Sequence, residues 1–214
     1  SNEVISKIKR KTYEDLGSFD SDSNLLTVEN GILHLDTLEL TPHTHTNLSK
    51  ILIPCAFITP KFDDIEGNLK DTLFWKYLKQ SFTVKGKFIK EDFETVLEVM
   101  ASVFIKHQID EKSVMFLGNG ENGKSVCLDY LSSLIGKNNI SHIPLHKLAE
   151  DKFAMAKLDG KLANVFADLE KNELRHTGCI KGISSGEPCF VQNKGKDGFD
   201  LYPISKLIFS TNKF

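Results

Sequence analysis

The chain has 214 residues, of which 40% are hydrophobic and 26% are charged, with a formal net charge of −2, a composition typical of a soluble globular protein of one or two domains. No apolar run approaches the roughly 20 residues of a membrane span, and the basic N-terminus lacks the apolar core of a signal peptide, so we expect an intracellular, cytoplasmic protein. The four cysteines show no C-x-x-C spacing, which argues against a zinc ribbon or a disulfide framework.

Residues 1–24 are polar and predict a helix followed by a loose linker. Apolar and polar residues then alternate around Asn30-Gly31, a dipeptide typical of tight hairpins. This pattern predicts three strands, near residues 25–28, 32–35 and 38–40. Apolar residues at helical spacing predict two core-facing helices, within residues 71–82 and 91–107.

The second half of the chain alternates apolar strands with helical segments. An apolar run at 114–117 predicts a buried strand, and KSVCLDYLSSLI after Gly123 predicts a helix that ends at Gly136. Residues 146–158 predict a helix that ends at Asp159-Gly160. Two further apolar runs predict buried strands, at 162–167 and 206–211. The order of elements favours an α/β fold with a parallel sheet.

Between the strand at 114–117 and the helix stands GNGENGKS, which fits the phosphate-binding pattern G-x-x-x-x-G-K-[ST]. In such a loop the backbone amides and the helix N-terminus face the phosphates of a nucleotide. Lys124 then neutralises their outer charge, and the Ser125 hydroxyl ligates Mg²⁺. The predicted nucleotide-binding residues are Gly118, Asn119, Gly120, Glu121, Asn122, Gly123, Lys124, Ser125 and Val126.

Hydrolysis of a bound nucleotide also needs carboxylates, and LANVFADLE supplies two of them. Asp168 and Glu170 are two residues apart, so in an extended strand they project to the same side. We expect them at the end of a strand beside the phosphate loop, with Asp168 in the Mg²⁺ shell and Glu170 activating water, or with these roles exchanged. Asn212, which closes the last strand, is the candidate sensor of the γ-phosphate.

A hairpin is predicted between the last two strands, with residues 190–193 and 199–202 flanking a tip that carries Lys194 and Lys196. From Lys181 onward, lysines exceed acidic residues by two in an otherwise acidic chain. Such a hairpin could follow a nucleic-acid backbone without reading its sequence. A solvated charged turn is the alternative.

The order GNGENGKS, GKLANVFADLE, IKGISSGEPCFVQNKGKDGFDLYP and KLIFSTN resembles the superfamily 3 helicases of the phage and plasmid primase-helicase family related to the poxvirus primase. VENGILHLDTLELTPHT resembles the domain that precedes the ATPase in that family. The resemblance covers about residues 24–214. It divides the chain into a polar segment (1–24), a family-specific domain (25–110) and a P-loop ATPase core (111–214).

The resemblance implies an AAA+-like ATPase that assembles as a hexameric ring and unwinds DNA by moving along one strand during phage, plasmid or mobile-element replication. Lys124 and Ser125 would be the Walker A pair, Asp168 and Glu170 the Walker B acids, and Asn212 the sensor. Lys181, Lys194 and Lys196 would contact single-stranded DNA, and the cofactors would be ATP and Mg²⁺.

Two departures from the family pattern affect the expected activity. The sequence stops at Phe214, where the family continues towards an arginine finger, so a C-terminally truncated fragment is expected. The primase half expected in full-length relatives is also absent. Arg10 and Arg175 are the only arginines. Without an arginine acting from a neighbouring subunit, hydrolysis would be slower by about 10³ to 10⁵. We therefore expect the chain to bind nucleotide and hydrolyse it poorly.

Three other functions share parts of these motifs. A helicase loader or another AAA+ protein would share the core chemistry, and a non-catalytic module for ring assembly or DNA binding would keep the fold alone. A P-loop kinase would need a lid with arginines, which the scarcity of arginine disfavours. The hairpin with its lysine tip favours the helicase.

Overall fold

A four-stranded parallel sheet forms the centre of the protein, in a computed structural model that describes residues 2–14, 16–60, 67, 69–118, 123–167 and 177–212. Its order is β6-β11-β8-β7, and all three neighbouring pairs are parallel. The strands are β6 (Val114–Leu117), β7 (Ile140–Ser141), β8 (Ala163–Phe166) and β11 (Lys206–Thr211). The predicted α/β class with a parallel sheet is confirmed.

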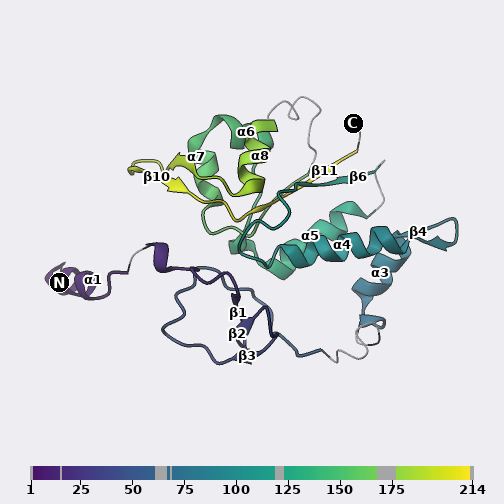
Figure 1. Cartoon of the computed structure of the whole chain (residues 1–214), viewed down its shortest axis with the longest axis horizontal. Coiled ribbons are helices and arrows are strands. Elements are labelled where there is room, and N and C mark those ends of the chain that lie inside the picture. Colours follow the sequence, from purple (N-terminus) through teal and green to yellow (C-terminus); the bar gives the residue numbers. More distant parts are fainter. Residues whose placement is uncertain are drawn as a thin grey trace.

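Helices cover both faces of this sheet (Figure 1). Residues alternate between the faces along a strand, so in β11 Ile208 belongs to one buried cluster while Leu207 and Phe209 belong to another. The first cluster is closed by α4 (Lys90–Ser102) and α5 (Lys124–Ile135). The second is closed by α6 (Leu145–Glu150), α7 (Lys152–Met155) and α8 (Thr177–Ser185).

The N-terminal part begins with α1 (Asn2–Lys11) and a short 3-10 helix (Leu16–Ser18), followed by a small antiparallel sheet of β1 (Leu25–Val28), β2 (Gly31–His34) and β3 (Leu40–Thr41). The predicted hairpin is present, with its turn one residue earlier than expected. Val28 pairs with Gly31, so Glu29 and Asn30 form the turn. Position 31 requires glycine for close packing and not for the turn, because a Cβ there would lie 2.4 Å from the Thr41 carbonyl oxygen.

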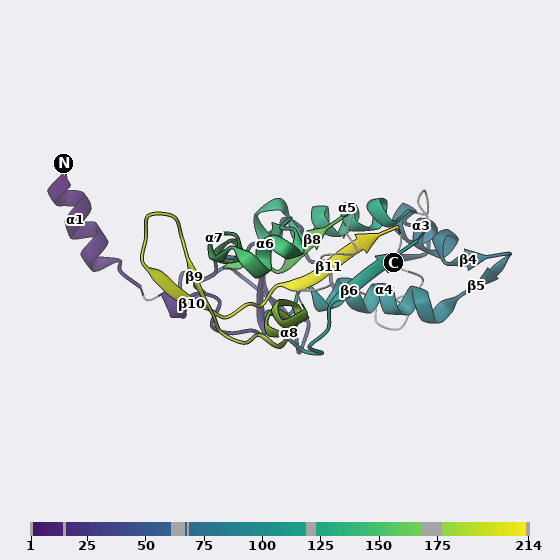
Figure 2. The same cartoon turned by 90° about the horizontal axis from the view of Figure 1, so that it is seen from above.

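The helix α3 (Leu73–Ser81) and the two-stranded ribbon of β4 (Thr83–Val84) and β5 (Lys87–Phe88) follow. Thr72 caps α3 by accepting a hydrogen bond from Trp75 N. Leu78 is buried as predicted, whereas Leu73 is 85% exposed and does not face the core. Figures 1 and 2 place α1 and the β4-β5 ribbon at opposite ends of the molecule.

Several elements differ from the prediction. The single helix expected at 146–158 is divided at Asp151, whose side chain accepts from Phe153 N and starts α7, and residues Ala156–Leu158 form a 3-10 helix. The sequence did not indicate α8, β7 or the 3-10 helix at Lys137–Asn139. The hairpin of β9 (Cys189–Gln192) and β10 (Gly198–Leu201) forms one residue earlier than predicted.

Asn164 is a polar residue in the apolar run of β8, and its side chain forms hydrogen bonds with residues 141 and 143. Its fully buried amide accepts from Ser141 Oγ and Ile143 N and donates to the Ile143 carbonyl. It thereby joins β8 to the chain that leaves the edge strand β7. In the part of the chain that the structure describes, no helix has both the length and the apolar content needed to cross a bilayer.

Candidate functional site

The carboxyl ends of β6 and β11 lie side by side at one edge of the sheet (Figure 2). The register pairs Leu117, the last residue of β6, with Thr211, the last residue of β11. Gly118 then continues the pairing by donating its N–H to the Thr211 carbonyl oxygen at 3.3 Å. This edge is where open parallel sheets bind their ligands. The first glycine of the predicted phosphate loop and the predicted sensor are therefore neighbours.

Lys124 reaches back to this edge from the start of α5. Its Nζ donates to the Gly118 carbonyl oxygen at 2.8 Å and to Asn212 Oδ1 at 3.0 Å. Lys124 and Asn212 are 88 residues apart in the sequence, and each was assigned to the site from its own motif. The structure thus places a cation and a polar amide in contact at the ends of two adjacent strands.

The helix α5 begins at a glycine in the left-handed region of φ. Gly123 is its N-cap and has φ = 83°, in the left-handed region that favours glycine. Glycine has no side chain with which to cap the helix, so the positive end of the helix dipole is left for an external anion. Ser125 and Val126 are exposed in the first turn.

Tyr77 of α3 contacts the end of this loop. Its hydroxyl donates to the Gly123 carbonyl oxygen at 2.5 Å. Tyr77 lies within the helix predicted at 71–82, and no local pattern could have indicated a partner 46 residues away.

The two predicted acids, Asp168 and Glu170, lie outside the described residues, as do loop residues 119–122. The strand that leads to the acids can be placed, and it corrects one expectation. β8 ends at Phe166 on the same edge of the sheet, but β11 lies between β8 and β6. The acidic segment therefore follows a strand two positions from the loop strand, about 10 Å away. β11 lies in the interior of the sheet, and all six of its residues are buried.

Cys127 lies in the first turns of α5. Burial raises its pKa to about 11. It therefore stays protonated near neutral pH and serves as packing, which agrees with its place in the buried cluster under the helix.

The predicted DNA-contacting lysines Lys194 and Lys196 are exposed at the tip of the β9-β10 hairpin, and Lys181 is exposed on α8. The tip is held by Gln192, whose Nε2 donates to the Lys196 carbonyl oxygen at 2.9 Å. Lys206 belongs to the lysines that exceed the acidic residues from Lys181 onward, but it is buried in β11 and is not available to a partner.

The chain is similar to one protein family and to several known proteins. Residues 116–214 match a family described as "Family of unknown function (DUF5906)". The chain is 23% identical over 211 residues to "Putative helicase 121R" of Invertebrate iridescent virus 3, covering 94% of this chain and 21% of that protein.

Two solved structures of the NrS-1 C-terminal region share the fold. The apo A form superposes with a TM-score of 0.52 at 16% identity, covering 64% of this chain and 32% of that one. A second apo structure gives a TM-score of 0.52 at 14% identity, with 64% and 34% covered. The chain thus spans about a fifth of the viral relative and about a third of the structural ones. The fold is shared with the solved structures, and the sequence is distantly similar to a viral protein named as a helicase.

Proposed function

We propose that this chain is the ATP-binding core of a DNA helicase of the superfamily 3, AAA+-like type, which couples ATP hydrolysis to movement along single-stranded DNA. The observation that carries the proposal is the position of Lys124 Nζ, between the Gly118 carbonyl and the Asn212 amide at the carboxyl ends of β6 and β11. The distant similarity to a viral protein named as a helicase supports the choice of helicase among ATPases.

The residues at this edge fit a magnesium-bound triphosphate. Lys124 would neutralise the outer phosphates, the start of α5 would present backbone amides, and Ser125 and Asp168 would hold the Mg²⁺. When bound, the metal neutralises charge on the phosphate oxygens. Asn212 has its Oδ1 turned to Lys124, so its amide N–H groups are the donors that could orient a water or a γ-phosphate oxygen. Glu170 is the proposed base that polarises that water.

The hairpin is the proposed contact with DNA, and the active form is proposed to be a hexameric ring. Lys194 and Lys196 at the tip would neutralise phosphates of one strand without reading bases. Hydrolysis by this chain is expected to be slow, because its only arginines are Arg10 and Arg175.

The test is the effect of single-stranded DNA on ATP hydrolysis and on binding at several salt concentrations. The unaltered chain should hydrolyse ATP slowly and faster with DNA. The double change Lys194→Ala with Lys196→Ala should keep the basal rate and lose the stimulation. Two lost phosphate contacts should also reduce the magnitude of the slope of log K against log[salt] by about 1.4.

The chain offers a matched control in the β4-β5 ribbon, whose tip is also Lys-Gly-Lys. Lys85→Ala with Lys87→Ala removes the same charge from exposed positions at another part of the surface. This control should retain DNA stimulation. ATP hydrolysis that does not respond to DNA in any of the three proteins would contradict the helicase proposal and favour a kinase or a loader. Equal losses in both double variants would remove the hairpin from the mechanism.

A further inference from the structure

The contact between α3 and the phosphate loop joins two segments that the sequence assigns to different domains. Tyr77 Oη donates to the Gly123 carbonyl oxygen at 2.5 Å. Three residues before Tyr77 on α3, Phe74 stacks on Tyr130 of α5, with ring centroids 3.5 Å apart and planes 11° from parallel. The helix α3 is therefore held against α5 by a ring stack, and the hydroxyl of Tyr77 is aimed at the residue where α5 begins.

The Gly123 carbonyl receives a second hydrogen bond from inside the helix. Cys127 N donates to the same oxygen at 3.1 Å, as the first intrahelical bond of α5. A carbonyl oxygen has two lone pairs, so Tyr77 and Cys127 together satisfy it. Gly123 also has no room for a side chain on the Tyr77 side, because a Cβ would lie 2.6 Å from the tyrosine oxygen.

The direction of this carbonyl determines the direction of the next amide. The peptide between Gly123 and Lys124 is trans, since the described residues contain no cis peptide bond. In a planar trans peptide the C=O and N–H groups point in opposite directions. With the carbonyl held towards α3 and the body of α5, the N–H of Lys124 points out beyond the start of the helix, which is the direction of the proposed triphosphate.

We propose that Tyr77 is a positioning residue of the nucleotide site, which fixes the Gly123–Lys124 peptide so that the Lys124 amide faces the phosphates. This inference rests on the proposed function and adds to it a residue from the segment before the ATPase core. It also gives the 25–110 segment a role, since α3 becomes part of the wall of the phosphate loop. Burial raises the pKa of Tyr77, so its hydroxyl keeps its proton and remains a donor through the neutral range.

The test is Tyr77→Phe, which removes the hydroxyl and keeps the ring against α5. The affinity for MgATP, measured by calorimetric titration, should fall by about threefold to tenfold, as expected for one lost hydrogen bond. The loss should be specific to phosphate recognition, so the affinity for adenosine, measured by competition, should not change. Tyr130→Phe removes a tyrosine hydroxyl from the same ring stack and should bind MgATP as the unaltered chain does.

The denaturant midpoints of the nucleotide-free proteins show whether a variant also changes the stability of the fold. A Tyr77→Phe chain that binds MgATP as well as the unaltered one would overturn the inference, whether or not its stability had changed. Equal losses for MgATP and adenosine would also overturn it, because they would indicate a general disturbance of the site. If the unaltered chain failed to bind MgATP, the proposed function would fail and this inference with it.

Discussion

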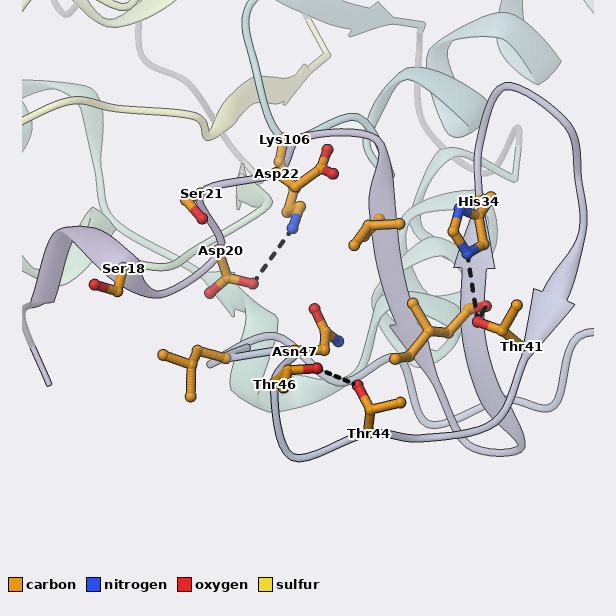
Figure 3. Close-up of a pocket in the computed structure, with 13 residues that line it drawn as sticks. Ser18, Asp20, Ser21, Asp22, His34, Thr41, Thr44, Thr46, Asn47 and Lys106 are labelled. Carbon is orange, nitrogen blue, oxygen red and sulfur yellow. Dashed lines mark hydrogen bonds and ion pairs between the residues drawn. The ribbon is translucent and has the colours of Figure 1, made fainter. Parts of the chain in front are cut away.

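Asp20 connects three separate segments of the N-terminal part through one largely buried carboxylate. Its Oδ1 accepts from Ser49 Oγ at 2.5 Å and lies 3.5 Å from Lys106 Nζ, and its Oδ2 accepts from Lys50 N at 2.9 Å. The side chains of Lys106 and Asp20 are 4% and 12% exposed. Figure 3 shows this pair at the wall of a cavity of about 280 Å³ that is also lined by hydroxyl side chains, among them those of Thr44 and Thr46.

Removing the cation of this pair should be costly, because the carboxylate would stay buried without it. We expect Lys106→Met to lower the free energy of unfolding by about 3 kcal/mol, the lower end of the range for a broken buried pair, since Asp20 keeps its two other donors. Lys90→Met is the control. Lys90 and Glu94 are closer, at 3.3 Å, but are 73% and 52% exposed, and such a pair contributes at most about 1 kcal/mol. Urea unfolding measures the free energy of unfolding of both variants. Similar losses would show that burial does not explain how much the Asp20–Lys106 pair contributes to stability.

Lys206 should make stability depend on pH in the mildly alkaline range. Its Nζ donates to the carbonyl oxygens of Ile105, His107 and Ile204. Burial lowers its pKa from 10.5 to about 8, although the nearby Asp110 acts in the opposite direction. Between pH 8 and 10.5 the unfolded chain therefore binds more protons at this residue than the folded chain, and stability rises with pH.

The change Lys206→Met isolates this contribution. From pH 7.5 to 9, the unfolding free energy of the unaltered chain should rise relative to that of the variant. Cys127 and Cys179, whose pKa values burial raises to about 11, act with the opposite sign at higher pH, but both proteins carry them and their contribution cancels in the difference. A difference between the two proteins that stays constant over this range would contradict the lowered pKa.

At the scale of single elements, the sequence predicted best where local signals mark both ends. The strand β6, the helix α5 and the strand β11 have the predicted bounds, because apolar runs are bordered by glycine or by polar residues. The helix α8 was not predicted because TGCIKGISS contains two poor helix formers, Gly178 and Gly182. Its place depends on tertiary packing, with Ile183 fully buried in the cluster beneath it.

The same distinction applies to the site. The predicted phosphate loop and the predicted sensor come from motifs that are each continuous in the sequence, and the hydrogen bond between Lys124 and Asn212 joins the two motifs. Tyr77 could not be assigned, because its role depends on how α3 packs against α5. The roles given to Asp168 and Glu170 stay predictions.

At the scale of the whole molecule, strand order decides which groups meet. β8 precedes β11 in the sequence, yet in the sheet β11 lies between β6 and β8. β11, which leads to the predicted sensor Asn212, is thereby the direct neighbour of β6, which leads to the predicted phosphate loop. The carboxyl ends of β11 and β6 form one edge of the sheet. In the sequence, Asp168 and Glu170 follow β8, which lies on the other side of β11.

The division into domains at residue 110 stays a prediction, and the core does not stop at that point. One buried cluster contains Leu26 and Ile53 of the N-terminal part together with Leu131 of α5 and Ile208 of the central sheet. The stacked rings of Phe74 and Tyr130 cross the same boundary. A change in the first 110 residues is therefore expected to reach the central sheet through packing.

The central claim is that Lys124 holds the outer phosphates of a nucleotide at the edge formed by β6 and β11. Its most direct test is the calorimetric titration of the unaltered chain and of Lys124→Ala with MgATP, with Lys137→Ala as a control just beyond the other end of α5. We predict binding by the unaltered and control chains and a loss of about tenfold to 150-fold for Lys124→Ala, the scale of a charge-assisted contact to phosphate. Equal MgATP affinity in all three proteins would contradict it.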